Sequence, residues 1–203
     1  MEAVEETTFS FSSEAPQQPN RRQQRRHMTI LRVATLVRDD GCELCLIRNI
    51  SAGGVKAHVY STLTAGDPVA VELKSNQRIA GKVVWTDGSN AGIAFDAPVD
   101  VEELLSSQTL QNGWRPRLPR VEVDRLATLR LGAHVYGVST RDISQGGVKI
   151  ETDCPFEEGE EVVLTLDRFR PIQGVVRWYE DGLCGIAFNH VISFQELIGW
   201  LRR

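Results

Sequence analysis

The chain has 203 residues, with 23 lysines and arginines against 27 aspartates and glutamates, which gives a formal net charge of −4. Its 41% hydrophobic and 25% charged residues and its 17 glycines are typical of a globular protein and exclude a collagen-like, fibrous or wholly disordered chain. The acidic balance argues against general affinity for nucleic acid or anionic membranes, and no apolar run approaches the roughly 18 residues that span a bilayer.

The first 20 residues are rich in Glu, Ser, Thr, Gln and Pro, and they have neither the basic start nor the apolar run of a secretory signal. We interpret residues 1–20 as a disordered N-terminal tail. Without an export signal the four cysteines should stay reduced, so we expect a cytoplasmic protein with no membrane insertion.

Four arginines follow the tail directly: Arg21, Arg22, Arg25 and Arg26. In an acidic chain this arm is the obvious place for an anion to bind, because a guanidinium can hold a phosphate through two hydrogen bonds and can also pair with the edge of a guanine. The alternative is a solvated basic arm that binds nucleic acid weakly or binds nothing.

Short β-branched or apolar runs then alternate with turn residues, and Asp39-Asp40-Gly41 between the first two runs signals a hairpin. Six short strands at this spacing suggest a closed antiparallel barrel, because closure removes exposed sheet edges. A helix is expected next, at Val101–Leu110. The six strands are expected at Arg32–Arg38, Glu43–Ile50, Val55–Val59, Pro68–Leu73, Arg78–Thr86 and Ala91–Phe95.

The second half of the chain repeats the first at a constant offset of 93 residues. Residues 48–56 match residues 141–149 at seven of nine positions, and the same register superposes Trp85 on Trp178. A gapless repeat this long indicates a duplicated small domain.

The fold class is therefore mainly β, with two tandem six-stranded antiparallel barrels, each followed by a C-terminal α-helix. We expect the domains at residues 21–110 and 114–203. The second helix is expected at Ser193–Leu201, where apolar residues recur at helical spacing. The connection between the copies is short, so the two barrels should touch.

The residues with reactive side chains do not suggest an enzyme. The four histidines and four cysteines show no metal-ligand spacing, and Cys42 and Cys45 lack the second cysteine pair of a structural zinc site. The carboxylates are scattered, and no phosphate-binding glycine loop is present. We interpret the cysteines as structural thiols and expect no catalytic residue, no metal and no cofactor.

A compact polar motif ends one strand in each copy: Asn49-x-Ser51-x-x-Gly54, repeated as Asp142-x-Ser144-x-x-Gly147. One interpretation is structural, because Asn, Asp and Ser satisfy turn amides and glycine supplies a positive φ. The other is a binding site, because these polar groups can meet the edge of a base and glycine lets a ligand approach the backbone.

The arginine arm and this motif together resemble the PilZ domain, the bacterial receptor module for cyclic di-GMP. Its pattern is Arg-x-x-x-Arg in an N-terminal arm, followed some twenty to thirty residues later by Asp/Asn-x-Ser-x-x-Gly on a six-stranded barrel. Arg22 and Arg26 fit the arm spacing, and so do Arg21 and Arg25. The resemblance covers residues 20–203, as two copies.

The resemblance implies a second-messenger receptor whose ligand is cyclic di-GMP. The arm would hold the phosphates and guanine edges, the polar turn of the first barrel would bond a guanine, and binding would order the arm and change a surface for a downstream protein partner. The implied ligand residues are Arg21, Arg22, Arg25, Arg26, Asn49, Ser51 and Gly54.

The second copy departs from this pattern in its arm. No two of its arginines are four residues apart, and at the repeat offset Arg26 corresponds to Pro119. Its candidate site is Arg120, Asp142, Ser144 and Gly147. We expect this copy to bind ligand poorly or to serve as a structural partner.

Trp85 and Trp178 could stack on a guanine, but their places inside a strand favour packing in the barrel core or under a helix. Lys56 and Lys149 are interpreted as solvated strand lysines. The rival function is a ligand-independent PilZ-like adaptor for other proteins, and a third is a nucleic-acid binder that uses the basic arm, which the acidic remainder disfavours.

Overall fold

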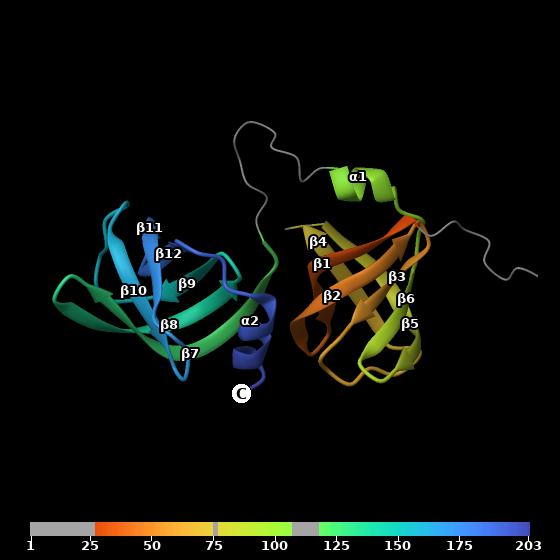
Figure 1. Ribbon diagram of the computed structural model, residues 1–203, viewed down its shortest axis with the longest axis horizontal. Helices are drawn as coiled ribbons and strands as arrows, with labels where there is room; N and C mark the ends of the chain where they lie inside the picture. Colours follow the sequence, from red (N-terminus) through yellow and green to blue (C-terminus); the bar gives the residue numbers. More distant parts are fainter. Residues whose placement is uncertain (1–26, 75–76, 107–117) are drawn as a thin grey trace, which may run out of the picture.

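The computed structural model of the chain describes residues 27–74, 77–106 and 118–203. These residues form two closed six-stranded antiparallel barrels that lie side by side (Figure 1). The first barrel closes in the order β1-β2-β3-β6-β5-β4. Its strands are β1 (His27–Arg38), β2 (Gly41–Ser51), β3 (Gly54–His58), β4 (Pro68–Lys74), β5 (Gln77–Asp87) and β6 (Asn90–Phe95).

The second barrel repeats this topology, with strand order β10-β11-β12-β9-β8-β7. A helix follows each barrel, α1 (Val101–Ser106) after the first and α2 (Phe194–Leu201) after the second. The fold class and the duplication predicted from sequence are confirmed. The strands of the second barrel are β7 (Arg120–Leu131), β8 (His134–Ser144), β9 (Gly147–Glu151), β10 (Glu161–Leu166), β11 (Ile172–Glu180) and β12 (Leu183–Phe188).

Most expected boundaries agree with the observed strands to within a few residues, and the hairpin at Asp39-Asp40-Gly41 joins β1 to β2. The largest difference is β1, which begins at His27 rather than Arg32. The proposed tail and the arginine arm lie outside the described residues, and so do residues 107–117, which include the end of the first expected helix and the start of the second expected domain.

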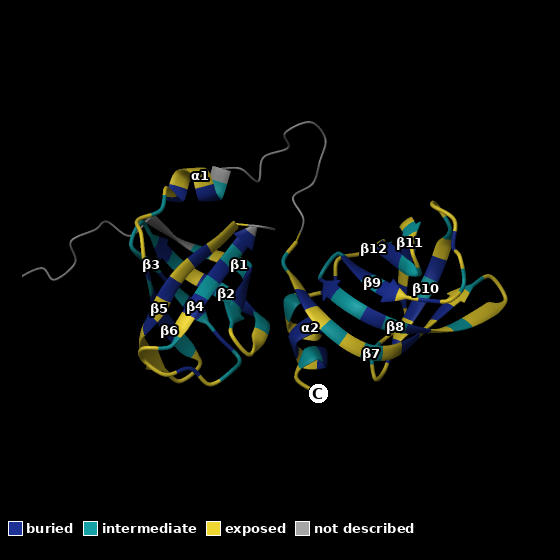
Figure 2. Ribbon diagram, turned by 180° about the vertical axis from the view of Figure 1, so that it is seen from behind, coloured by how far each residue is buried: buried dark blue, intermediate teal, exposed yellow. Residues whose placement is uncertain are grey.

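Each barrel interior is filled by the inward side chains of its own strands. Alternate residues of β2, β5, β8 and β11 are buried, as expected where one face of a strand meets a core (Figure 2). Aliphatic residues such as Leu36, Ile47, Leu129 and Leu164 have no exposed side-chain area. The barrels are therefore packed, with no internal ligand cavity implied by their burial pattern.

Helix α2 is held at both ends. Ser193 caps its N-terminus in a capping box with Glu196. At its C-terminal end, the Arg125 guanidinium donates to the carbonyls of Trp200 (2.8 Å) and Leu201 (3.0 Å) and lies 4.5 Å from the Trp200 ring centroid. A cation at this end also complements the helix dipole. The repeat-equivalent Arg32 donates to the carbonyl of Leu105 on α1 (3.4 Å).

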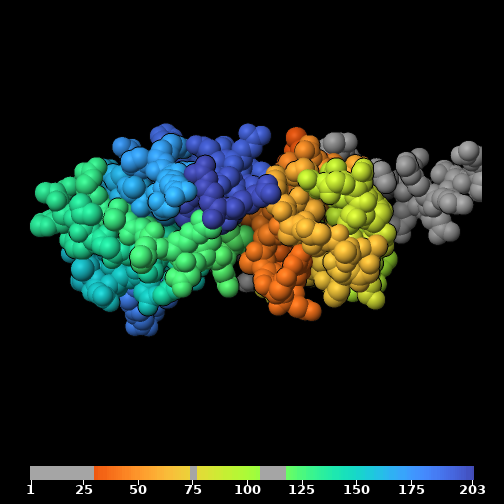
Figure 3. All heavy atoms as spheres, turned by 90° about the horizontal axis from the view of Figure 1, so that it is seen from below, coloured from red at the N-terminus to blue at the C-terminus, as the bar shows by residue number. Residues whose placement is uncertain are grey.

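The two barrels contact each other through α2 and the start of β7. Tyr60 of the first barrel packs on Phe194, with ring centroids 5.9 Å apart, and Arg202 lies over the same tyrosine. The Thr35 hydroxyl donates to the carbonyl of Arg120 (3.3 Å). Figure 3 shows the dark blue C-terminal segment against the first barrel, so the expectation that the barrels touch is confirmed.

Neither helix in the described part of the chain is long and apolar enough to cross a membrane.

Replacing Arg125 with methionine should lower the free energy of unfolding by roughly 1.5–3 kcal/mol, because two charge-assisted hydrogen bonds to the end of α2 are lost. Urea denaturation measures this. Arg177→Met, on an exposed position of β11, is the control and should change stability by less than about 0.5 kcal/mol. Equal effects of the two substitutions would contradict the proposed hold on α2.

Candidate functional site

The polar motif of the first barrel spans the turn between β2 and β3. The Ser51 hydroxyl donates to the carbonyl of Gly54 (3.2 Å), which closes the turn. A Cβ at Gly54 would lie 2.4 Å from the carbonyl oxygen of Ile93 on β6, so no side chain fits there. The backbone of Gly54 is not left-handed, and its role is therefore the close approach of two strands rather than the positive φ considered from sequence.

The second barrel builds the same turn between β8 and β9. Ser144 donates to the carbonyl of Gly147 (3.2 Å), and a Cβ at Gly147 would lie 2.5 Å from the carbonyl oxygen of Ile186. In both copies the serine thus closes the turn and the glycine allows two strands to approach closely. The chemical difference between the two motifs lies in Asn49 against Asp142.

Asn49 begins a row of cross-strand neighbours on the outer face of the first barrel. It pairs with Lys56 on β3, Lys56 pairs with Gly92 on β6, and Gly92 pairs with Trp85 on β5. The indole of Trp85 covers Gly92, where a Cβ would lie 2.0 Å from Nε1. Lys56 Nζ lies 5.7 Å from the Trp85 ring centroid. The row therefore combines an amide, a cation and an aromatic face.

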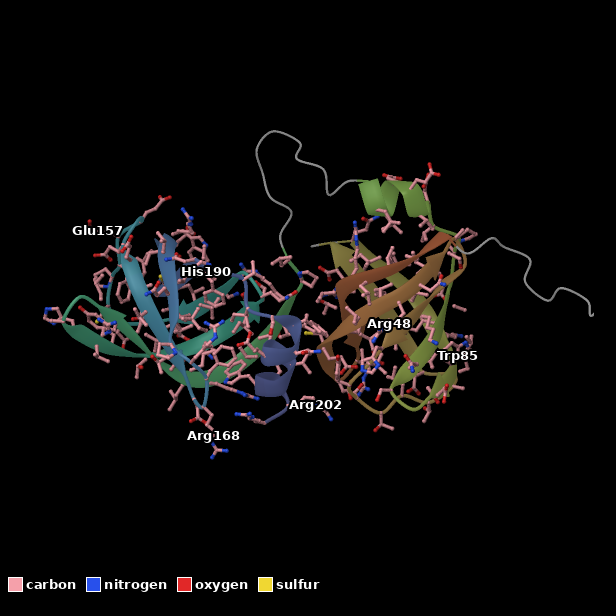
Figure 4. All side chains as sticks on the ribbon, viewed as in Figure 1. Arg48, Trp85, Glu157, Arg168, His190 and Arg202 are labelled. Carbon is pink, nitrogen blue, oxygen red and sulfur yellow. The ribbon has the colours of Figure 1, made fainter. Side chains whose placement is uncertain are left out.

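Trp85, which Figure 4 labels on the first barrel, is 38% exposed and its counterpart Trp178 is 42% exposed, so the expectation that they pack in the core or under a helix is wrong. The reason is a register shift between Val83 and Trp85, which adds one residue to the outer face of β5. Val83 points inward, and both following residues are exposed. A matching shift precedes Trp178.

Register shifts also precede the polar residue of each motif, between Ile47 and Asn49 in β2 and between Thr140 and Asp142 in β8. Bulges often lie beside binding sites because they redirect side chains. The aromatic and polar ends of each row are both set by such a shift, and nothing in the residue pattern alone signals it.

The row in the second barrel is Asp142, Lys149, Gly185 and Trp178. Here the carboxylate is already occupied, because Oδ1 lies 2.5 Å from Arg120 Nη1 and Oδ2 lies 3.0 Å from Lys149 Nζ. The Asp142 side chain is only 14% exposed. Lys149 is thus ion-paired rather than simply solvated.

The structure brings together most of the site residues expected from sequence. Asn49 lies on β2 just before the turn that Ser51 and Gly54 close. In the second copy Arg120 pairs with Asp142, and Ser144 bonds Gly147 in the turn that follows. The arm residues Arg21, Arg22, Arg25 and Arg26 lie outside the described residues. They immediately precede β1, whose Thr29 pairs with Asn49.

A shallow pocket of about 180 Å³ lies at the opposite end of the β1–β2 hairpin. Its polar groups bond one another: Arg38 pairs with Asp40, and Ser61 donates to Glu43 (2.6 Å). Because these groups are already paired and lie away from the motif, the pocket is a weaker candidate than the outer row.

The thiols are poor nucleophiles. Burial raises the pKa of the Cys45 thiol strongly, and it raises that of Cys184 to about 11. Cys42 and Cys45 lie on opposite faces of β2, with Cys45 inside the barrel. Within the described ranges, no group of three or more His, Cys, Asp or Glu side chains is arranged to hold a metal ion.

The chain was compared with protein families, with curated proteins and with solved structures. The family model described as "PilZ domain" matches it twice, at residues 20–112 and 115–203. The chain has no significant match among curated proteins.

Solved structures with a similar arrangement include three bacterial proteins. The PlzA protein of Borreliella burgdorferi in complex with c-di-GMP is 14% identical, with 84% of this chain and 86% of that chain covered and a TM-score of 0.38. The Bacillus subtilis inhibitor of motility MotI/DgrA is 12% identical, with 85% and 95% covered and a TM-score of 0.33. YcgR from Escherichia coli in complex with c-di-GMP is 10% identical, with 84% and 80% covered and a TM-score of 0.33.

In the folded chain, Cys45 and Cys184 should resist a thiol reagent at pH 8, because burial blocks access and keeps both protonated. The half-buried Cys42 and Cys154 should react at least about tenfold faster. Labelling followed by peptide mass spectrometry gives the four rates. Labelling in urea is the control and should make the rates similar, and rapid native labelling of Cys45 would contradict the assignment.

Proposed function

Because this chain belongs to the PilZ domain family and carries the domain twice, we propose that it is a cytoplasmic receptor for cyclic di-GMP that binds its ligand on the first barrel. The observation that carries the proposal is the outer row from Asn49 to Trp85. Asn49, at its polar end, pairs with Thr29 near the start of β1, and β1 directly follows the arginine arm.

The ligand carries two phosphates and two guanines, and the first barrel offers a group for each. The arm of Arg21, Arg22, Arg25 and Arg26 would grip the phosphates and the guanine edges. The Asn49 amide can donate and accept at a guanine edge, and Ser51, which already donates to Gly54, retains lone pairs to accept a further bond.

Trp85 adds a partner that the motifs do not include. Its indole lies flat enough on Gly92 that no Cβ fits beneath it, and the ring stays 38% exposed. A base stacked on such a ring gains roughly 1–3 kcal/mol. Lys56, beside the same ring, would add positive charge for a phosphate.

The second barrel would bind ligand weakly. Its Asp142 is held by Arg120 and Lys149, so a ligand would have to break two ion pairs before it reached the carboxylate. This observation favours the adaptor function for that half of the chain. We infer that the first barrel senses the ligand and that the second supports contacts with a downstream protein.

Ligand binding would bring the arm against the first barrel and thereby change a surface next to β1. The two barrels share an interface that includes Thr35 of β1 and Arg120 of β7, so a change at β1 has a direct route to the second barrel. A nucleic-acid function is disfavoured by the net charge of −4.

Titration calorimetry with cyclic di-GMP should reveal one class of site. Arg22→Ala and Arg26→Ala should each weaken binding by about 1–3 kcal/mol, because charge-assisted hydrogen bonds are lost. Arg115→Ala and Arg117→Ala, in the linker before the second barrel, are matched controls and should bind as the wild type does. Unchanged affinity after replacing all four arm arginines with alanine would refute the site.

The two exposed tryptophans provide a matched pair. Trp85→Leu should weaken cyclic di-GMP binding by roughly 1–3 kcal/mol because stacking is lost, whereas Trp178→Leu should bind like the wild type. In addition, quenching of tryptophan fluorescence by the ligand should disappear only in Trp85→Leu. Equal losses in both variants would contradict binding on the first barrel alone.

A further inference from the structure

The outer face of β1 and β2 in the first barrel is buried by the second barrel. Leu44 lies on this face and is only 1% exposed, and it belongs to the hydrophobic cluster of the second barrel. Val33 and Cys42 pack against the same cluster, and Thr35 bonds the carbonyl of Arg120. In the first copy, this face of the domain therefore forms an interface with another domain.

The corresponding face of the second barrel, 93 residues later on β7 and β8, is open. Val33 is replaced by Leu126, which is 80% exposed, and Cys42 by Val135, which is 63% exposed. Thr128 lies between them in the sequence and is exposed as well. The yellow segments along β7 in Figure 2 mark this surface, which keeps exposed aliphatic side chains with nothing over them among the described residues.

Gly137 takes the place of Leu44 on this face. It lies in the middle of β8, its backbone is not left-handed, and a Cβ there would meet nothing within 4 Å. Glycine weakens the interior of a strand, and where no local geometry requires it, it allows another backbone to come close. Among the described residues, no backbone or side chain lies close enough to Gly137 to require a glycine there.

The exposed side of β7 carries a negative charge on one side of Leu126 and a positive charge on the other. Asp124, which is 78% exposed and pairs through one oxygen with Arg141 of the same barrel (2.9 Å), lies on one side of Leu126, and the exposed Arg130 lies on the other. Asp124 and Arg130 are equally far from position 127. A two-fold axis near position 127 would therefore place Asp124 of each copy opposite Arg130 of the other copy. A two-fold symmetric interface needs such self-complementary charges, because the same surface meets itself.

We propose that the β7–β8 face of the second barrel joins two copies of the chain in a two-fold symmetric dimer. The two β7 strands run antiparallel across the interface. Leu126 of each copy packs on the partner's Gly137 and Thr128, and Asp124 pairs with the partner's Arg130. This inference is independent of the ligand and of the first barrel's site.

Sedimentation velocity on the full chain without cyclic di-GMP tests the proposal. The expected species has twice the 22.6 kDa mass of the chain, and Leu126→Asp should raise its dissociation constant at least about tenfold. Val191→Asp, another exposed apolar position in the same domain but outside this face, is the control and should leave the dimer unchanged. A monomer at every concentration, or equal losses in both variants, would overturn the dimer.

Gly137→Gln separates association from folding. A side chain has room there in the single chain, so the melting temperature should stay the same or rise, while the dimer should weaken at least about tenfold because close approach is blocked. A dimer of wild-type affinity in this variant would place the interface elsewhere and overturn the proposal.

A charge exchange tests the symmetry. Arg130→Glu and Asp124→Lys should each weaken self-association, because each puts like charges opposite one another. An equimolar mixture of the two variants should form a mixed dimer, in which both pairs are again complementary, and native mass spectrometry would detect it. If both variants fold and no mixed dimer forms in excess of the two homodimers, the antiparallel arrangement is wrong.

Discussion

The constraint on which this molecule depends is that the interior of a six-stranded barrel is occupied by its own side chains and leaves little room for a ligand. The inward side chains of each barrel occupy its interior, as the fully buried Leu36, Ile47 and Leu129 illustrate. Whatever the domain binds must therefore be met on its outside. The chain meets this constraint with register shifts before Asn49 and Trp85, which turn an amide and an indole outward at the two ends of one row.

The duplication repeats the same scaffold with one chemical difference in the outer row. Both copies keep the serine that closes the turn, the glycine that lets two strands approach, and the tryptophan that lies over a glycine. They differ at one position of the row, where the first copy has an amide and the second has a carboxylate held between two cations. This one difference gives the second copy a polar group that is ion-paired within the chain.

Arg120 links this difference to the contact between the barrels. Its side chain holds Asp142, and its backbone carbonyl accepts the hydrogen bond from Thr35 of the first barrel. The opening residue of β7 therefore belongs both to the second copy's site and to the inter-barrel interface. The outer face formed by the first two strands is covered by the second barrel in the first copy, whereas the equivalent face is exposed in the second copy. The reason is that no third barrel follows among the described residues to cover it.

Residue patterns were enough to predict the duplication, the six strands of each copy, the two helices and the polar turn, because local alternation and a gapless repeat do not depend on tertiary contacts. The positions of the arm arginines remain a prediction, since the described residues begin at His27.

Three features became visible only in the folded chain: the face that each tryptophan occupies, the close strand approach that requires glycine at position 54, and the two cations that pair with Asp142. A one-residue bulge moves a side chain from the core to the surface and leaves no mark in the pattern of residue types. Close strand approach and ion pairing likewise join residues far apart in the chain. These contacts exist only once the barrel has closed.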